Sequence, residues 1–280
     1  MREIKIIGKN GYIARNYKLL SRIQDSHLNF ISTSQIDEIE SEKKTKIPMC
    51  PTDILWLGYG MDFYKFDEGK REVDNLKKIL SNKKFSSSRI ILMSSGGTVY
   101  SGDKYPYKET EPLKGRNTYG EHKILLEQML IKSGLNYVIL RLGNVYGGVT
   151  SEQITHGVIN KWVSNLAKNK SIELTSPIES FQDYIYIKDL MEALDKIFKS
   201  NISESIFNLS FGNPVTLNTI LEILSKTYGT INLIKTSRHL HNNYILNTDL
   251  INRAILWTPR YDIKLGMEDF ISTKRNYQRC

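Results

Sequence analysis

Short apolar runs alternate with longer segments of helical periodicity along the first half of the chain. The runs "IKIIG", "LNFIST", "DILWLG", "SRIILMSS" and "NYVILRLGN" are typical of buried strands. Between them, the stretch from Tyr12 to about Ile23, "VDNLKKIL" and "GEHKILLEQMLIKSG" carry apolar residues at helical intervals. This alternation predicts βαβ units, a parallel sheet and, with right-handed crossovers, a doubly wound α/β (Rossmann) fold.

The pattern changes after Gly148. Helical stretches such as "GVINKWVSNLAKN" and "TLNTILEILSKTYG" are then separated by short strands and loops. We therefore expect a dinucleotide-binding Rossmann domain over residues 1–146 and a smaller α/β substrate-binding lobe over residues 147–280. The segment 181–190, "FQDYIYIKDL", is expected to return to the first sheet.

Composition and cysteine content point to an ordinary globular protein. The 280 residues are 40% hydrophobic and 25% charged, which suits one large or two modest domains. The two cysteines, Cys50 and Cys280, are expected to be free thiols in a reducing compartment. The first residues do not resemble a signal peptide, and no apolar run approaches the ~20 residues that span a bilayer. These features predict a cytoplasmic protein without a membrane segment.

A formal net charge of +9 raises the question of nucleic-acid binding. Lysine and arginine are spread along the chain, without a basic run that contains interleaved aromatic residues. A dispersed positive surface also attracts small phosphorylated molecules. An anionic small molecule is therefore the expected partner, rather than nucleic acid or a membrane, and no metal site is expected.

The first strand runs directly into "GKNGYIA", with glycines at positions 8 and 11 and an alanine at position 14. Gly8 permits a tight turn, Gly11 lets the backbone approach a pyrophosphate, and Ala14 allows close packing of helix on sheet. The following helix N-terminus offers N–H groups to phosphate. A plain turn between strand and helix is the alternative.

The end of the second strand bears on the choice of cofactor. It reads "ISTSQ", and the first carboxylate after it is Asp37. Hydroxyl groups there, together with Lys9 or Arg15, favour NADP over NAD, because NAD sites place an acidic residue against the ribose 2′-hydroxyl. Alternatively, Lys9 and Arg15 are only solvated.

Five segments and a C-terminal pair, in order, resemble the extended short-chain dehydrogenase/reductase family, in its nucleotide-sugar epimerase, dehydratase and reductase branch. They are "GKNGYIA", "SSGGTVY", "YGEHK", "RLGNVYG", "FQDYIYIKD" and the C-terminal pair "FNLSFGNPVTL" and "LWTPRYDIKLGMED". The resemblance covers nearly the whole chain. It implies a bound nicotinamide dinucleotide, held by Gly8, Lys9, Gly11, Tyr12, Ile13, Ala14, Ser32, Ser34, Leu57, Tyr119 and Lys123.

"YGEHK" matches the family's Tyr-x-x-x-Lys pair. Positions i and i+4 share one face of a helix, so Lys123 can lie beside Tyr119. The resemblance implies that Tyr119 exchanges a proton with the sugar oxygen and that Lys123 binds the nicotinamide ribose. A nearby ammonium should also favour the phenolate, whose ordinary pKa is about 10. A solvated pair on a helix face is the alternative.

The chain departs from the family pattern at several positions. The hydroxyl that orients the reacting oxygen is replaced by Gly96, so we expect Thr98, or else Ser95, to take this role. No acidic pair accompanies it, which disfavours elimination of water. Gln182 stands where the family has a phosphate-binding arginine, and Tyr186 replaces a histidine.

Further expected substrate contacts are Asn144 and Arg238, the latter matching a later pyrophosphate arginine of the family. Arg238 could instead be an ordinary surface residue, and Asn144 could be structural.

The predicted function is an NAD(P)-dependent oxidoreductase acting on a nucleotide-activated sugar. The favoured reaction is reduction of a 4-keto (6-deoxy) sugar by NADPH in surface-polysaccharide sugar synthesis. A 4-epimerase of the UDP-hexose type with tightly bound NAD is the alternative, and a non-catalytic dinucleotide-sensing protein is more remote. The resemblance also implies a homodimer.

Overall fold

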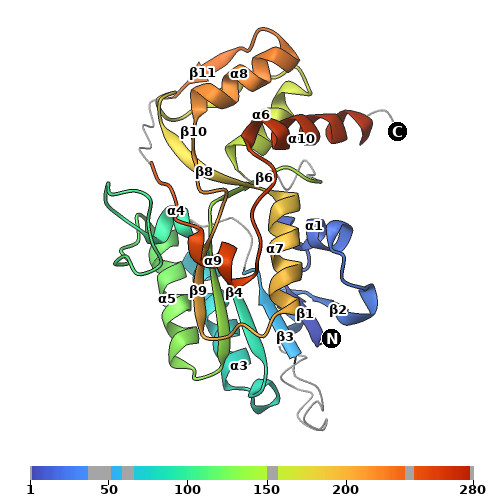
Figure 1. Cartoon of the computed structure of the whole chain (residues 1–280), viewed down its shortest axis with the longest axis vertical. Coiled ribbons are helices and arrows are strands. Elements are labelled where there is room, and N and C mark those ends of the chain that lie inside the picture. Colours follow the sequence, from blue (N-terminus) through green and yellow to red (C-terminus); the bar gives the residue numbers. More distant parts are fainter. Residues whose placement is uncertain (1, 37–51, 59–65, 150–156, 237–242, 278–280) are drawn as a thin grey trace.

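The computed structural model describes residues 2–36, 52–58, 66–149, 157–236 and 243–277 (Figure 1). Six strands form one sheet in the order β2 (Leu28–Ile31), β1 (Glu3–Ile7), β3 (Thr52–Trp56), β4 (Arg89–Ser95), β5 (Asn136–Leu142) and β9 (Ser205–Leu209). Every neighbouring pair in this sheet is parallel. The carboxyl ends of the strands therefore lie along one edge.

Helices cover both faces of the sheet. Helices α1 (Tyr12–Leu20) and α7 (Ile187–Lys199) share one core cluster, whereas α3 (Phe66–Ser81) and α5 (Thr118–Lys132) share another. Successive strand residues point to opposite faces, so Ile6 belongs to the first cluster and its neighbour Ile7 to the second. The expected doubly wound α/β fold is confirmed.

A smaller lobe lies above the carboxyl edge of this sheet in Figure 1. It contains a sheet of β10 (Pro214–Thr216), β8 (Phe181–Tyr186) and β6 (Asn144–Tyr146), and a pair of β11 (Leu233–Lys235) with β7 (Ile172–Leu174). Its helices are α6 (Val158–Leu166), α8 (Leu217–Tyr228) and α10 (Ile263–Tyr277). The remaining elements are α4 (Gly96–Val99), α9 (Asp249–Ala254), η1 (Asp25–His27), η2 (Thr33–Gln35) and η3 (Lys83–Phe85).

One strand assignment needs correction. The segment 181–190 does not join the main sheet, because Phe181–Tyr186 pairs with β6 and β10 instead. The chain returns to the main sheet through α7, which contacts α1, and through β9, which pairs with β5. The alternating pattern identified a buried strand correctly, but it carries no information on which sheet that strand joins. The division at residue 146 stays a prediction.

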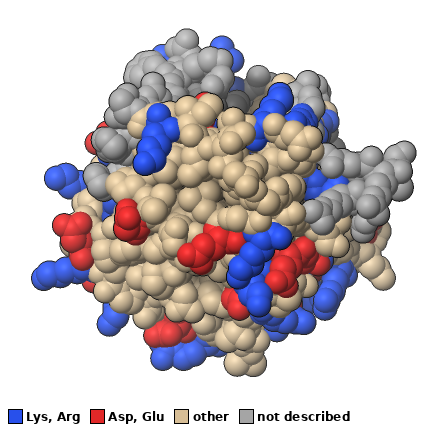
Figure 2. Space-filling view, turned by 90° about the horizontal axis from the view of Figure 1, so that it is seen from above, with Lys and Arg blue, Asp and Glu red and all other residues tan. Residues whose placement is uncertain are grey.

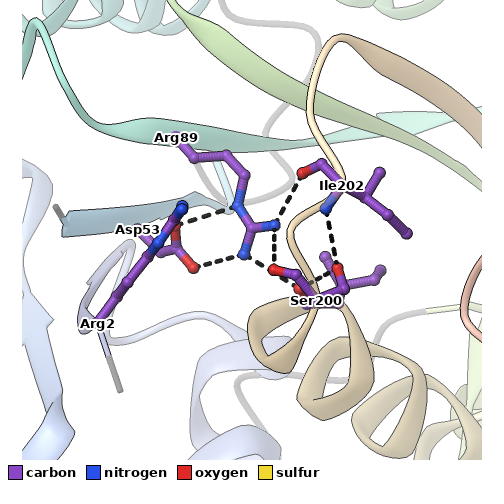
Figure 3. A network of polar contacts seen from close by, with 6 residues as sticks. Arg2, Asp53, Arg89, Ser200 and Ile202 are labelled. Carbon is purple, nitrogen blue, oxygen red and sulfur yellow. Dashed lines mark hydrogen bonds and ion pairs between the residues drawn. The ribbon is translucent and has the colours of Figure 1, made fainter.

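A buried ion pair of the main sheet holds the end of α7 in place (Figure 3). Arg89 on β4 donates to both carboxylate oxygens of Asp53 on β3, at 3.1 and 2.6 Å. The same guanidinium donates to the carbonyls of Ile197, Ser200 and Ile202, at the end of α7 and just after it. All five N–H donors of the buried guanidinium therefore have acceptors, which offsets its desolvation.

The charged side chains are intermixed on the face seen in Figure 2. Lysine and arginine lie beside aspartate and glutamate around a broad uncharged centre, over the part of this face that is coloured. None of the helices in the described residues is long and apolar enough to cross a membrane.

Candidate active site

The carboxyl ends of the central strands bring the sequence motifs together. Gly8 follows β1, Gly58 follows β3, and Ser95 ends β4. Ser95 pairs with Leu142 at the end of β5, two residues before Asn144. This edge is where open parallel sheets bind ligands.

The glycine turn has the geometry expected of a phosphate-binding turn. Gly8 has a φ of +103°, which favours glycine, and its carbonyl accepts a hydrogen bond of 2.9 Å from the Gly11 N–H. A Cβ at Gly8 would lie only 3.1 Å from the carbonyl oxygen of Gly58. Helix α1 begins at Tyr12, and Ala14 is fully buried against the sheet.

These features fit a pyrophosphate, because the first-turn N–H groups of α1 face the end of a glycine turn. Two other expected cofactor residues, Ile13 and Leu57, are half-buried near this turn. The Tyr12 hydroxyl is turned elsewhere: it donates to the carbonyl of Gly147 at 2.5 Å.

Polar groups gather at the end of β2. The Lys9 ammonium donates to Gln35 Oε1 at 3.2 Å, and the same oxygen accepts from the Ser32 N–H. The hydroxyls of Ser32 and Ser34 are 2.9 Å apart. Lys9, Ser32 and Ser34 are therefore neighbours, as their proposed shared role requires, whereas Arg15 donates to the Asn10 carbonyl. Asp37 lies outside the described residues.

Tyr119 and Lys123 lie on one face of α5. The Lys123 ammonium is 5.5 Å from the centre of the Tyr119 ring, while Tyr119 is half-buried and Lys123 is only 4% exposed. The helix begins after Asn117, whose side chain accepts from the Gly120 N–H at 2.9 Å. Tyr119 therefore occupies the first turn, with Lys123 one turn deeper.

Helix α5 is tied to the sheet by buried polar groups. Arg141 on β5 pairs with Glu127 at 2.7 Å, and Ser94 on β4 donates to the same carboxylate at 2.5 Å. Gly120 lies against α4, because a Cβ there would come within 2.2 Å of the Thr98 carbonyl oxygen. These contacts fix the height of Tyr119 relative to the ends of β4 and β5.

The electrostatics of Tyr119 differ from the expectation. Burial raises the pKa of its phenol, Lys123 lowers it, and the carboxylate of Glu72 raises it again. The net direction is upward, so the phenol is protonated at neutral pH. Lys123 alone would favour the phenolate as expected, but burial and Glu72 outweigh it.

Sequence reasoning did not identify Glu72. Its carboxylate is 3.4 Å from the Lys123 ammonium and also contacts His122 and Trp56. On a helix with many charged residues, a glutamate is normally solvated, and nothing in "REVDNLKK" distinguishes this one. The contact between Trp56 on β3 and Glu72 on α3 is visible only when the strand and the helix are placed together.

Gly96 occupies the position at which the family has a hydroxyl, and this position is closely packed. A Cβ at Gly96 would lie 2.6 Å from Leu246 Cδ1, and one at Gly97 would lie 2.8 Å from the ring of Tyr244. A side chain at either position would displace these buried residues. Ser95 and Thr98 are both half-buried nearby, and the Thr98 hydroxyl is 3.5 Å from the Ser95 carbonyl oxygen.

Two expected substrate residues meet in the smaller lobe. Asn144 on β6 donates to Gln182 on β8 at 2.6 Å, and the Tyr184 hydroxyl contacts the same amide at 3.3 Å. The pair is uncharged, so it does not replace a phosphate-binding arginine. Tyr186 is buried and its hydroxyl donates to Asp269. Arg238, Cys50 and Cys280 lie outside the described residues.

Comparison with known proteins finds a family whose model matches the part of the chain that carries several of these motifs. Residues 74–210 match the model of the NAD dependent epimerase/dehydratase family, and this range contains "YGEHK", "RLGNVYG" and "FQDYIYIKD". The match covers just under half of the chain, and it confirms the resemblance that the sequence motifs indicated. The chain is an enzyme of the extended short-chain dehydrogenase/reductase type, as those motifs indicated.

Two of the similar proteins are named for different reactions. The chain is 29% identical over 224 residues to the dTDP-4-dehydro-6-deoxyglucose reductase of Escherichia coli, covering 74% of this chain and 71% of that protein. It is 26% identical to a putative UDP-glucose 4-epimerase of Methanocaldococcus jannaschii, covering 70% and 66%.

A UDP-glucose 4-epimerase from Thermotoga maritima, solved with UDP-glucose, superposes with a TM-score of 0.81 at 20% identity. It covers 98% of this chain and 99% of that one. At this identity the likeness concerns the fold.

Proposed function

We propose that the enzyme is a nucleotide-sugar oxidoreductase and that its reaction is the reduction of a 4-keto (6-deoxy) sugar. The observation that carries the proposal is the Tyr119–Lys123 pair, with the ammonium 5.5 Å from the ring centre, at the carboxyl edge of the parallel sheet. A bound nicotinamide dinucleotide would supply the hydride. The similarity to the Escherichia coli reductase supports the choice of substrate class.

Tyr119 would donate the proton that a carbonyl oxygen needs as it becomes a hydroxyl. Burial and Glu72 raise the pKa of this phenol, so it carries its proton at neutral pH. Lys123 would hold ribose hydroxyls of the cofactor. An ammonium has three N–H donors, so its contact with Glu72 leaves two for a ribose diol.

The two candidate reactions use Tyr119 in different ways, and the choice of reduction rests on the similarity to the Escherichia coli reductase. A reductase begins with a neutral phenol that gives a proton, whereas an epimerase must first remove a proton from a sugar hydroxyl. The 4-epimerase remains the second candidate, because relatives with that name match this chain in sequence or in fold.

The cofactor preference is a finer part of the proposal. The family is NAD dependent by description. A preference for NADP in this chain is supported by the ammonium of Lys9 beside Ser32 and Ser34, and by the absence of a carboxylate from residues 28–36. The hydroxyls and the ammonium would bind a 2′-phosphate.

The proposed substrate contacts are Asn144 and Gln182. Their amides form one hydrogen-bonded unit just beyond β5, where they could bind hydroxyl or carbonyl groups of a sugar nucleotide. Arg238 would supply the positive charge for its pyrophosphate.

The test is incubation with a panel of nucleotide sugars and 4-keto-6-deoxy intermediates, with NADPH and NADH absorbance followed. Oxidation of the cofactor by a 4-keto sugar supports the reductase. Interconversion of UDP-hexoses without net cofactor consumption, by protein that retains NAD through purification, would assign the epimerase instead. No turnover and no dinucleotide binding would refute both.

A further inference from the structure

A carboxylate is buried directly beneath the proposed catalytic pair. Glu72 lies on α3 and is 4% exposed, and its side chain reaches across to α5. Its Oε1 is 3.4 Å from the Lys123 ammonium, and its Oε2 is 2.8 Å from His122 Nε2. The indole N–H of Trp56 donates to Oε1 at 3.1 Å. Three groups from β3 and α5 therefore converge on one carboxylate.

The end of β3 is shaped to admit this carboxylate. A Cβ at Gly58 would lie 2.4 Å from Glu72 Oε1 and 3.1 Å from the Lys123 ammonium. Gly58 also has a φ of +78°, which a residue with a side chain rarely adopts. The missing side chain leaves the space in which the carboxylate and the ammonium meet, at the strand end that faces the glycine turn.

The carboxylate is charged despite its burial. Burial raises the pKa of Glu72, but Lys123, His122 and Trp56 together lower it to about 2. Burial lowers the pKa of Lys123, but Glu72, Tyr119 and Glu127 together more than offset this, so the ammonium is also stabilised. The same carboxylate contributes to the raised pKa of Tyr119. Glu72 therefore acts on both members of the pair.

We propose that Glu72 is a positioning residue of this active site: its carboxylate holds the Lys123 ammonium in place beside Tyr119. The inference rests on the proposed function, because it assigns Tyr119 and Lys123 to the chemistry. Glu72 itself touches neither the sugar nor the transferred hydride in this proposal.

The titratable groups that act on Glu72 and Lys123 come from α5. From α5, His122 and Lys123 contact Glu72, and Tyr119 lies beside Lys123. Glu127, also on α5, acts on Lys123 from the side of the sheet. Strand β3 contributes the neutral Trp56. Any change in the charge at position 72 should therefore appear first at Lys123 and Tyr119.

The first test needs neither cofactor nor substrate. Lysine labelled with ¹³C reports protonation through its Cε signal, and the signal of Lys123 is assigned by its loss in Lys123→Arg. In the wild-type protein, Lys123 should stay protonated throughout a titration from pH 7 to 10. In Glu72→Gln, which keeps the side chain's shape, burial is opposed only by the smaller effects of Tyr119 and Glu127, and the midpoint should fall below that of the wild-type protein.

The second test is the pH dependence of turnover. Reduction requires a protonated Tyr119, so the rate falls as pH rises through the pKa of that phenol. Glu72→Gln removes a charge that opposes the phenolate, so this basic limb of the pH–rate profile should move to lower pH. The matched control is Asp74→Asn on the same helix, whose carboxylate is 52% exposed. It should leave both the lysine signal and the limb unchanged.

Glu72→Asp provides a second variant, which is used if Glu72→Gln fails to fold. If Glu72→Gln does not fold, Glu72→Asp retains the charge but retracts it from Lys123, and it should shift both readouts in the same direction by a smaller amount. A lower melting temperature with an unchanged Lys123 titration and an unchanged limb would mean that Glu72 is only structural, which overturns the proposal. If the wild-type enzyme turns over no panel substrate, the proposed function fails, but the Lys123 titration still decides the role of Glu72.

Discussion

The ammonium of Lys123 is buried between an acid and a phenol. It is 3.4 Å from a Glu72 oxygen and 5.5 Å from the centre of the Tyr119 ring, with 4% of the residue exposed. A charge in such a place is costly unless it is paired, and the pairing here orients it toward the edge where the cofactor turn lies. Its substitution should therefore affect more than one property.

Lys123→Met keeps the length of the side chain and removes its charge. We expect dinucleotide binding to weaken by about tenfold or more and turnover to fall, because the ammonium is assigned both to the ribose and to the tyrosine. Fluorescence titration with NADPH and steady-state kinetics measure the two effects separately. Unchanged binding would remove Lys123 from the cofactor site.

Two hydroxyls compete for the role that Gly96 leaves open. Thr98 and Ser95 are both half-buried beside the short helix α4, and Thr98 adjoins the first turn of α5 through Gly120. We expect Thr98→Val to reduce turnover more than Ser95→Ala does, when both are measured at saturating cofactor. The reverse ranking would transfer the role to Ser95, and two small effects would mean that neither hydroxyl orients the sugar oxygen.

The placement of Tyr119 beside Lys123 could be predicted from their spacing in the sequence. "YGEHK" on a helical pattern places a phenol and an ammonium on one face whatever the rest of the fold does. Glu72 could not be predicted in this way, because its role depends on the approach of α3 to α5 and on the absence of a side chain at Gly58. Likewise, the obstruction at Gly96 comes from Leu246, which is 150 residues further along the chain.

At the scale of elements, the height of α5 against the sheet determines where Tyr119 lies. The helix approaches α4 so closely at Gly120 that a Cβ there would be 2.2 Å from the Thr98 carbonyl oxygen. At its other end, Glu127 joins it to Arg141 and Ser94. A small change at this contact should therefore shift Tyr119, the proposed catalytic residue.

Gly120→Ala tests this contact. Alanine normally stabilises a helix by roughly 0.5–1 kcal/mol relative to glycine. Here we expect the opposite, a loss of about 1–3 kcal/mol, because the added methyl group overpacks the interface. Urea unfolding measures the change, with Gln128→Ala on the exposed side of α5 as the control. A gain in stability would show that α5 and α4 are not in close contact.

The order of strands was more predictable in the first half than in the second. Each of the first five strands of the main sheet follows the alternation of strand and helix, and the pattern places them in a doubly wound sheet. Beyond residue 146, short strands such as β8 and β9 look alike in sequence. Their sheets are determined by long-range contacts, including those of Arg89 with the carbonyls after α7.

At the scale of the whole molecule, the excess of positive charge suits a cofactor with an extra phosphate. The net charge is +9, and Lys9 places one of these charges beside the hydroxyls at the end of β2. A dispersed positive field also raises the local concentration of nucleotide sugars, which are anions.

NADPH should therefore bind more tightly than NADH. The expected difference is about tenfold, or ~1.4 kcal/mol, and it should shrink in Lys9→Ala, which removes the ammonium. Isothermal titration of both cofactors against both proteins measures it. If NADH binds tenfold more tightly to the wild-type protein, the preference is wrong and the chain follows its family's description as NAD dependent.

The central claim is that Tyr119 gives a proton to a sugar carbonyl as hydride is transferred. Its most direct test is the rate of NADPH oxidation with a nucleotide-linked 4-keto-6-deoxy sugar, comparing the wild-type protein with Tyr119→Phe. The phenylalanine keeps the ring and its packing and removes only the acid, so turnover should fall by about 10²–10⁴-fold while NADPH binding changes little. Near-full turnover by Tyr119→Phe would contradict the account, because the pair on α5 would then have no part in the reaction.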